Sequence, residues 1–307
     1  MDRRDFLKKS LILGGITGAS FFINSRKTLI AKSKNNMDLS KDLVAIKGGE
    51  PEIMFDKAIK ELGGMSSFVR KGQKVVIKPN IGWNRTVEFG ATTHPKLIKR
   101  IIEHCKEAGA KKIYVFDHPC DYWERAYKTS GIEQAAKEAG AIVVPSGDEK
   151  YYQKVKVPKG KRLKETKVHE LILDSHVFIN VPILKSHSST RLTIAMKNLM
   201  GAIWDRGFYH GNGLEQCIAD FCTYRKPDLN IVDAYYVMMK YGPSAGTPEV
   251  VNNMKYQLIS KDIVAIDAAA AKIFGMEPKE VSHIKIASDM EIGNIDLDKM
   301  NIKRLTI

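Results

Sequence analysis

Apolar residues along the chain group into short compact runs that alternate with amphipathic stretches. Compact β-branched runs predict buried strands, whereas apolar residues spaced three and four apart predict helices. Pro95 suits the first turn of a helix and Gly109 suits its stop. The first half of the chain is therefore expected to hold strands at 43–47, 74–78, 112–117 and 141–144, separated by helices at about 52–62, 95–108 and 132–139.

The second half repeats this alternation after a basic segment. Residues 151–167 contain Pro158-Lys159-Gly160 between weakly alternating stretches, which predicts a hairpin at the edge of the sheet, where lysines hinder edge-to-edge association. Thr190 is expected to cap a helix at 192–200. Further strands are expected at 171–173, 176–181, 229–233 with an extension over 235–240, 255–260 and 302–307, and further helices at 213–224, 262–274 and 278–288.

The alternation predicts an α/β fold with a mainly parallel sheet flanked by helices. Strands separated by helices of this length favour parallel pairing with right-handed crossovers. A length of 307 residues fits either two Rossmann-like lobes or one large doubly wound domain. The expected segments are a leader and linker at 1–36, an N-terminal lobe at 37–147, a basic hairpin at 148–170 and a C-terminal lobe at 171–307.

Positive charge is concentrated in two segments. The chain carries 49 Lys and Arg against 35 Asp and Glu, a formal net charge of +14. Residues 1–34 hold eight basic residues against two acidic ones, and residues 148–167 hold eight against three. In the second segment the aromatic residues are limited to Tyr151 and Tyr152. Nucleic-acid binding combines basic with stacking side chains, so a nucleic-acid partner is not expected.

The first basic segment resembles a twin-arginine export signal. Arg3 and Arg4 precede Phe-Leu-Lys and an apolar stretch at 11–23, although Asp2 stands where Ser or Thr is usual. The stretch is shorter than the roughly 20 residues of a membrane-spanning helix. The alternative is a buried helix of the folded domain. We expect export across the cytoplasmic membrane by the twin-arginine machinery, with membrane attachment only if residues 1–30 persist uncleaved as an anchor.

Polar residues follow several predicted strands. In open α/β sheets, ligands bind outside the carboxyl ends of the strands. Any one such residue is ordinarily a cap or turn residue, but agreement among several strand ends favours a site. The residues at these positions are Lys78, Asn80, Asp117, His118, Asn180, Lys185, His187 and Asp233.

A further segment adds basic groups to this edge of the sheet. Lys185, His187, Lys197 and Asn198 fall within one strand-loop-helix unit, which favours a site for a carboxylate or phosphate. Lys197 lies among apolar neighbours and is either a buried functional amine or a lysine that extends its ammonium to water.

A Gly/Thr loop and a small-residue loop complete the candidate features. Residues 90–95 contain Thr93 and His94 and either cradle an anion with backbone amides or simply cap the next helix through Thr93. Residues 241–248 are small and rich in Gly and Pro, which is typical of a lid.

Several catalytic and cofactor motifs are missing. No dinucleotide-binding glycine motif follows the first strands, and no phosphate-binding Walker loop, serine-nucleophile elbow or His-Glu-x-x-His is present. The Cys217-x4-Cys222 spacing is not that of a zinc ribbon or ferredoxin, although one cysteine pair stays open. No metal-ligand spacing is recognised in the sequence. Metal binding is left open, with His94, His118, His187, His210, Asp117 and Asp233 as the candidate ligands.

Several blocks together resemble a known family. They lie at residues 76–80, 91–95, 108–110, 115–117, 180–187, 196–201, 231–234, 242–246 and 262–268. With their Lys-x-His and Lys-Asn-x-x-Gly motifs, these blocks resemble the family called domain of unknown function 362, from about residue 43 to 275. The resemblance implies no known reaction. Some members carry an appended ferredoxin module, which is not recognised in this sequence, and some carry a twin-arginine leader.

These features support two hypotheses. The first is an exported α/β protein that binds a small anion, either as a binding protein or as an acid/base enzyme. His187 or His94 is then the acid/base, Lys197 is a further catalytic candidate, and the ligand-binding residues are Lys78, Asn80, Thr93, Lys185 and Asn198, with Asp117, Asp233 and Asp267 in orienting roles. The second is a metal- or iron–sulfur-associated redox accessory protein. Cofactor, substrate, enzymatic activity and oligomeric state are left open.

Overall fold

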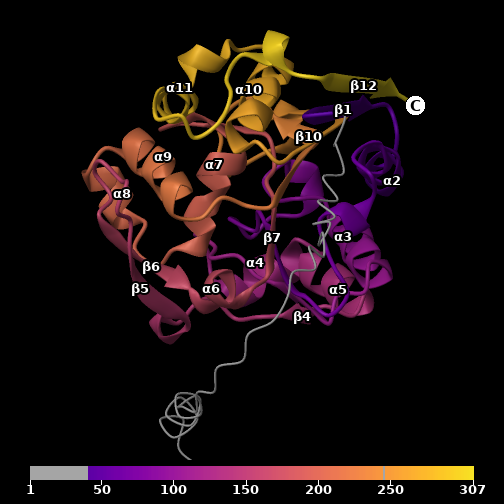
Figure 1. Ribbon diagram of the computed structural model, residues 1–307, viewed down its shortest axis with the longest axis horizontal. Helices are drawn as coiled ribbons and strands as arrows, with labels where there is room; N and C mark the ends of the chain where they lie inside the picture. Colours follow the sequence, from indigo (N-terminus) through magenta and orange to yellow (C-terminus); the bar gives the residue numbers. More distant parts are fainter. Residues whose placement is uncertain (1–40, 245) are drawn as a thin grey trace, which may run out of the picture. The chain divides into compact units, whose positions relative to one another are not determined.

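Eight strands form one sheet in the computed structural model (Figure 1), which describes residues 41–244 and 246–307. The expected leader at 1–36 lies outside the described residues. The strand order is β12-β1-β11-β10-β7-β2-β3-β4. The strands are β1 (Leu43–Lys47), β2 (Lys74–Pro79), β3 (Lys112–Val115), β4 (Ile142–Val143), β7 (Val177–Val181), β10 (Leu229–Met238), β11 (Val251–Ser260) and β12 (Ile302–Thr306).

The sheet is mainly parallel, as the sequence predicts. Only β11 runs antiparallel to its neighbours, β1 and β10, whereas the five other adjacent pairs are parallel. From β2 the chain proceeds outward through β3 to β4, and then returns to β7 on the other side of β2. The strand order therefore reverses between β2 and β7, and such a reversal opens a crevice at the carboxyl ends of the strands.

Helices cover both faces of the sheet because the central strands are apolar on both sides (Figure 1). In β2, for example, Val75 and Ile77 enter one core and Val76 enters the other. The first core contains residues of α2 (Pro51–Glu61), α3 (Pro95–Glu107), α4 (Trp123–Thr129) and α5 (Ile132–Glu138). The second contains residues of α6 (Glu170–Asp174), α7 (Ala195–Asn198), α8 (Gly207–Gly211), α9 (Leu214–Tyr224), α10 (Ile263–Phe274) and α11 (Ser282–Asp289). Short 3₁₀ turns lie at Met65–Ser67, Val87–Phe89, Glu149–Tyr151, Leu199–Ala202, Pro248–Val250, Pro278–Glu280 and Leu297–Lys299.

The two expected lobes share this sheet. Strand β1 belongs to the segment assigned to the N-terminal lobe, yet it pairs with β11 and β12 of the segment assigned to the C-terminal lobe. Leu43 enters one core and Val44 and Ile46 enter the other, so β1 must be covered on both faces and fits the interior of a sheet. The described residues accordingly form one compact unit, which corresponds to the large doubly wound alternative.

The basic segment forms a hairpin, but the hairpin does not extend the main sheet. Strands β5 (Tyr152–Lys156) and β6 (Glu165–His169) pair only with each other in a separate two-stranded sheet. The strand predicted at 171–173 is wrong, because these residues belong to α6. Helix α4 was not predicted, since its seven residues show little apolar periodicity.

The helix predicted at 192–200 is also wrong in its first turn. Arg191–Thr193 form β9, which pairs with β8 (Lys185–His187) in a second small hairpin. Thr190 does not cap a helix, because its hydroxyl donates to the carbonyl of Leu192. Only residues 195–202 are helical, as α7 followed by a 3₁₀ turn. The hairpin turns the chain back so that β8 and α7 face the same crevice.

Candidate functional site

A cleft of about 390 Å³ lies at the carboxyl ends of β2 and β3. Its walls come from the loops after these strands, from the β8–β9 hairpin and from α7 with the turn that follows it. Six of the predicted catalytic and ligand-binding residues line it: Asn80, Asp117, Lys185, His187, Lys197 and Asn198. The structure therefore brings these six side chains together, whereas Thr93, His94, Asp233 and Asp267 do not line the cleft. The metal-ligand candidates His118 and His210 line it as well.

A buried ion pair forms the floor of the cleft. Lys78 Nζ lies 2.6 Å from Asp117 Oδ1, and the Lys78 side chain is fully buried. Asp117 Oδ2 accepts a hydrogen bond from the Ile81 amide at 2.6 Å. Burial lowers the pKa of Lys78, and the Asp117 carboxylate opposes that shift. A Cβ on Gly201 would lie 1.9 Å from Asp117 Oδ1, so the pair depends on a residue without a side chain at this position.

A chain of four asparagines crosses the protein beside this pair. Asn80 donates to Asn198 at 2.8 Å, Asn198 donates to Asn180 at 2.8 Å, and Asn180 donates to Asn230 at 3.0 Å. These hydrogen bonds between asparagine side chains connect the end of β2 with α7, β7 and β10 through uncharged groups. The chain of asparagines orients Asn80 so that its Oδ1 accepts from Lys185 at 3.2 Å. Asn180 was among the polar residues singled out in the sequence, whereas Asn230 was missed, although it interrupts an apolar strand.

Lys185 is buried without a carboxylate partner among the described residues. Its Nζ donates to the carbonyl of Ala91 at 2.6 Å and to Asn80 Oδ1 at 3.2 Å, and both acceptors are neutral. Burial, with a smaller contribution from the nearby charge of Lys197, lowers the pKa of Lys185 to about 7. An amine with such a pKa is available as a neutral nucleophile or base near neutral pH.

His187 is held in one orientation by the backbone. Its Nδ1 accepts from the Ser189 amide at 3.0 Å, so the neutral ring carries its proton on Nε2. Burial, followed by the charges of Lys197 and Lys185, lowers the pKa of His187 to about 3. The ring therefore presents a neutral hydrogen-bond donor to the cleft. Its predicted acid/base role stays a prediction.

Lys197 and Arg206 contribute two further cations to the cleft. Lys197 Nζ contacts Met200 Sδ at 3.2 Å, and burial lowers the pKa of Lys197 to about 8. Arg206 donates to the carbonyls of His118 at 2.8 Å and Pro119 at 2.6 Å, and to Cys120 Sγ at 3.3 Å. Sequence reasoning missed Arg206, because it lies in a loop with no adjacent strand end or motif.

Four predicted site residues hold the backbone instead. His94, rather than Thr93, caps α3 by accepting from the Lys96 amide, and the Thr93 hydroxyl accepts from the Asn80 amide and donates to the carbonyl of Val181. Asp233 accepts from the amides of His94 and Tyr235.

Asp267 serves the same purpose at α7. Its two carboxyl oxygens accept from the amides of Ala195 at 2.7 Å and Met196 at 3.0 Å. Burial raises the pKa of Asp267 to about 8, opposed by these two hydrogen bonds. The carboxyl therefore fixes the start of the helix that carries Lys197 into the cleft.

The loop predicted to be a lid packs against the β8–β9 hairpin. The Gly242 amide donates to the Ser186 hydroxyl at 3.1 Å, and a Cβ on Gly242 would lie 1.8 Å from the Ser186 carbonyl oxygen. Pro243 lines the cleft. The loop is thus placed at the rim, and its opening and closing stay a prediction.

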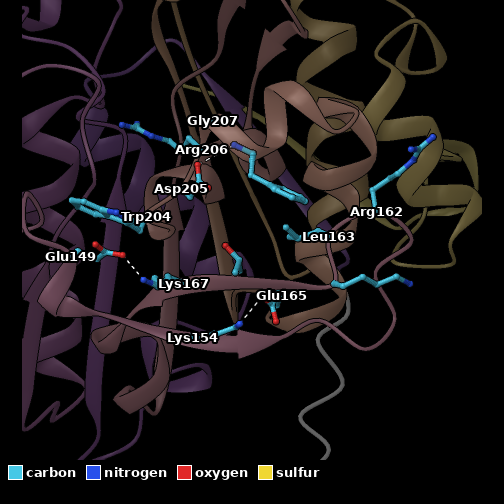
Figure 2. A pocket seen from close by; sticks show the side chains of 13 residues that line it. Glu149, Lys154, Arg162, Leu163, Glu165, Lys167, Trp204, Asp205, Arg206 and Gly207 are labelled. Atoms are coloured by element: carbon cyan, nitrogen blue, oxygen red, sulfur yellow. Dashed lines mark hydrogen bonds and ion pairs between the residues drawn. The ribbon is translucent and has the colours of Figure 1, made fainter.

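A larger cavity beside the basic hairpin carries no comparable arrangement. Figure 2 shows this cavity of about 800 Å³, in which Lys154 pairs with Glu165 and Lys167 pairs with Glu149. Five basic and three acidic residues line it, and two of the basic residues are in these ion pairs. Arg206 lines both cavities. Arg162 and Lys164 of the hairpin cavity are exposed to solvent, whereas Lys185 of the smaller cleft is buried and Lys197 is half-buried, so the burial of its cations favours the smaller cleft.

No metal centre is recognisable in residues 41–244 and 246–307. These residues contain no group of three or more His, Cys, Asp and Glu that could hold a metal ion. All four cysteines are free, with Cys120 exposed and the other three buried, so the cysteine pair left open by the sequence is not formed. In the same part of the chain, no helix is long and apolar enough to cross a membrane.

Comparison with known proteins places the chain in a family. It is 24% identical over 232 residues to a thylakoid-associated protein of Synechocystis sp., covering 73% of this chain and 70% of the relative. Two solved structures align at 11% identity and a TM-score of 0.44. One is a Thermotoga maritima protein (78% of this chain, 60% of that one), and the other is the lactate racemase apoprotein from Thermoanaerobacterium thermosaccharolyticum (80% and 56%). The chain thus spans less than two thirds of both structures, and these similarities carry no argument about activity.

The family profile matches a long continuous segment. Residues 75–272 match, which includes every residue that lines the cleft. Because the match covers more than half of the chain, the protein belongs to the family described as domain of unknown function DUF362.

Proposed function

We propose that the cleft binds a small anion, a carboxylate or a phosphate. One observation carries this proposal: Lys185, Lys197 and Arg206 line the same cleft, and none of them has a carboxylate partner among the described residues. The cleft's one lining carboxylate, Asp117, already pairs with Lys78. Cations gathered in a partly desolvated site repel one another, so an anionic ligand that neutralises them gains binding energy.

The charges and donors of the cleft suit a compact ligand. Its volume of about 390 Å³ accommodates a small molecule with some water. The guanidinium of Arg206 recognises planar anions, and the ammonium of Lys197 acts as a point charge. His187 adds a neutral donor. This arrangement supports binding of the ligand, and it narrows the catalytic candidates to Lys185, Lys197 and His187.

Calorimetry with oxalate, phosphate and the neutral analogue oxamide tests the proposal. We expect wild-type protein to bind at least one of the anions and not oxamide. Lys197→Met and Arg206→Met should each weaken binding about tenfold, the equivalent of about 1.4 kcal/mol. Arg191→Met is the matched control, because Arg191 is exposed and pairs with Glu280. Equal binding of oxamide, or unchanged binding by both cleft variants, would contradict the proposal.

The alternative, a metal- or cluster-associated redox accessory protein, has less in its favour. His118, Cys120, His187 and His210 line the cleft together with Asp117. However, no three of these or other described His, Cys, Asp and Glu residues gather as a metal site would require. We therefore prefer anion binding.

We propose further that the protein is exported. The support is the Arg3-Arg4 pattern with its apolar stretch, together with similarity to a relative described as thylakoid-associated, which favours a membrane-related location. Fused to a reporter, residues 1–36 should direct export, and replacing Arg3 and Arg4 together by Lys should reduce exported reporter at least about tenfold, since the export machinery reads the arginine pair. Lys8→Arg with Lys9→Arg is the matched control. Undiminished export by the Arg3/Arg4 variant would contradict a twin-arginine route.

A further inference from the structure

We propose that Lys185 is an amine nucleophile that forms an imine with a small 2-oxo acid bound in the cleft. The proposal rests on the proposed anion site and adds to it a substrate class and a covalent step. Two buried lysines near the cleft differ in their hydrogen-bond and ion-pair partners. Lys78 is fully buried and has Asp117 at 2.6 Å, whereas Lys185 is 1% exposed and has only neutral oxygen partners among the described residues.

The two hydrogen bonds of Lys185 fix the orientation of its side-chain nitrogen. A neutral amine has two N–H groups and one lone pair. The carbonyl of Ala91 and Asn80 Oδ1 take the two N–H groups, so the lone pair is left for a third direction. The side chain lines the cleft. Asn80 is itself held by Asn198, so the amine is oriented by a fixed network and not by a flexible neighbour.

The surroundings leave a substantial fraction of this amine unprotonated near neutral pH. Burial lowers the pKa of Lys185 to about 7. The charged and titratable groups that face it are Cys120 and Asp117, which favour its protonated form, and Lys197 and Lys78, which oppose it. Desolvation together with a neighbouring cation is the arrangement by which lysines become nucleophiles toward carbonyl groups.

The other cleft residues suit a carbonyl that lies next to a carboxylate. Arg206 and Lys197 provide positive charge for the carboxylate, and the Nε2–H of His187 provides a donor for the carbonyl oxygen. In the proposed step, Lys185 Nζ attacks the C2 carbonyl and a C–N bond forms. The carbonyl oxygen takes up a proton to become the hydroxyl of a carbinolamine. That hydroxyl takes up a second proton and leaves as water, while Nζ loses its protons and a C=N bond is formed. No oxidant or reductant takes part.

Reductive trapping on the intact protein tests the step. Wild-type protein is incubated with pyruvate or glyoxylate and sodium cyanoborohydride, and the adduct is located by peptide mass spectrometry. We expect modification at Lys185 at least tenfold above any other lysine, and protection by oxalate, which is an anion without a ketone or aldehyde carbonyl. An adduct mainly on Lys197 or spread over surface lysines overturns the proposal.

Two variants make the assay specific. Lys185→Met should lose the adduct, whereas Lys197→Met should keep it on Lys185 but need more pyruvate. Locating the adduct on wild-type protein tests imine formation at Lys185 even if the Lys185→Met variant fails to fold. Binding of oxalate by calorimetry without any trapping overturns imine formation and leaves anion binding standing. Absence of both overturns both proposals.

Discussion

Replacing Asp117 by Asn is expected to lower the free energy of unfolding by about 3–5 kcal/mol. The carboxylate lies 2.6 Å from Lys78 Nζ, and both side chains are buried. Asparagine keeps an oxygen for the Ile81 amide, so the variant mainly removes the negative charge. The loss follows because Lys78 must then stay charged without a counter-charge or release its proton. Denaturant unfolding followed by circular dichroism measures the change.

The double variant Lys78→Met, Asp117→Asn separates charge pairing from packing. A buried ion pair replaced as a whole often costs little, so the double variant should recover most of the loss and lie within about 1 kcal/mol of wild type. Glu165→Ala is the control for an exposed pair with Lys154, and we expect it to cost less than about 1 kcal/mol. Additive losses in the double variant would show that the two charges are not coupled.

Lys185→Met is expected to change how stability depends on pH. The pKa of Lys185 is lowered to about 7, so between pH 7 and the ordinary lysine pKa the unfolded chain holds a proton that the folded protein lacks. Stability therefore rises with pH in this window. Relative to the Met variant, wild-type protein should gain about 2 kcal/mol between pH 7 and pH 9. The charged groups around it, Lys197, Lys78, Asp117 and Cys120, are the same in both proteins.

Urea unfolding of both proteins at pH 7, 8 and 9 measures this difference. Lys154→Met is the control for the loss of one basic residue, because Lys154 is exposed and pairs with Glu165. A bound anion favours the protonated lysine, so saturating oxalate should flatten the rise in wild-type protein. A constant difference between Lys185→Met and wild type across this range would contradict a lowered pKa in the folded protein.

The pattern of apolar residues was sufficient for most of the fold. Strand β1 is observed at Leu43–Lys47, as predicted, and α3 at Pro95–Glu107 ends one residue earlier than predicted. These elements are long or strongly apolar, so burial and local preference agree. The prediction failed for residues 171–173 and 192–193, which lie in short elements and adopt the conformation that their neighbours in space impose. It also left open whether the sheet was one or two.

The candidate site was predicted in part, and for a reason particular to parallel sheets. Lys78, Asn80 and Lys185 follow strands that end at one edge, so their positions in the sequence place them near one another. His94 and Asp267 look equally suitable in the sequence but hold backbone amides instead. The direction of a side chain depends on its partners in space, which the positions of strand ends do not specify.

The sequence determined the α/β class, the strand ends that carry polar groups and the uneven distribution of charge, because each is a local pattern of residue types. Tertiary structure decided which charges are paired. Asp117 neutralises Lys78, and Lys185, Lys197 and Arg206 have no carboxylate partner within residues 41–244 and 246–307. Net charge sums all of these groups equally. Their chemistry depends on burial and on distances of a few ångströms, which arise only when distant segments of the chain pack together.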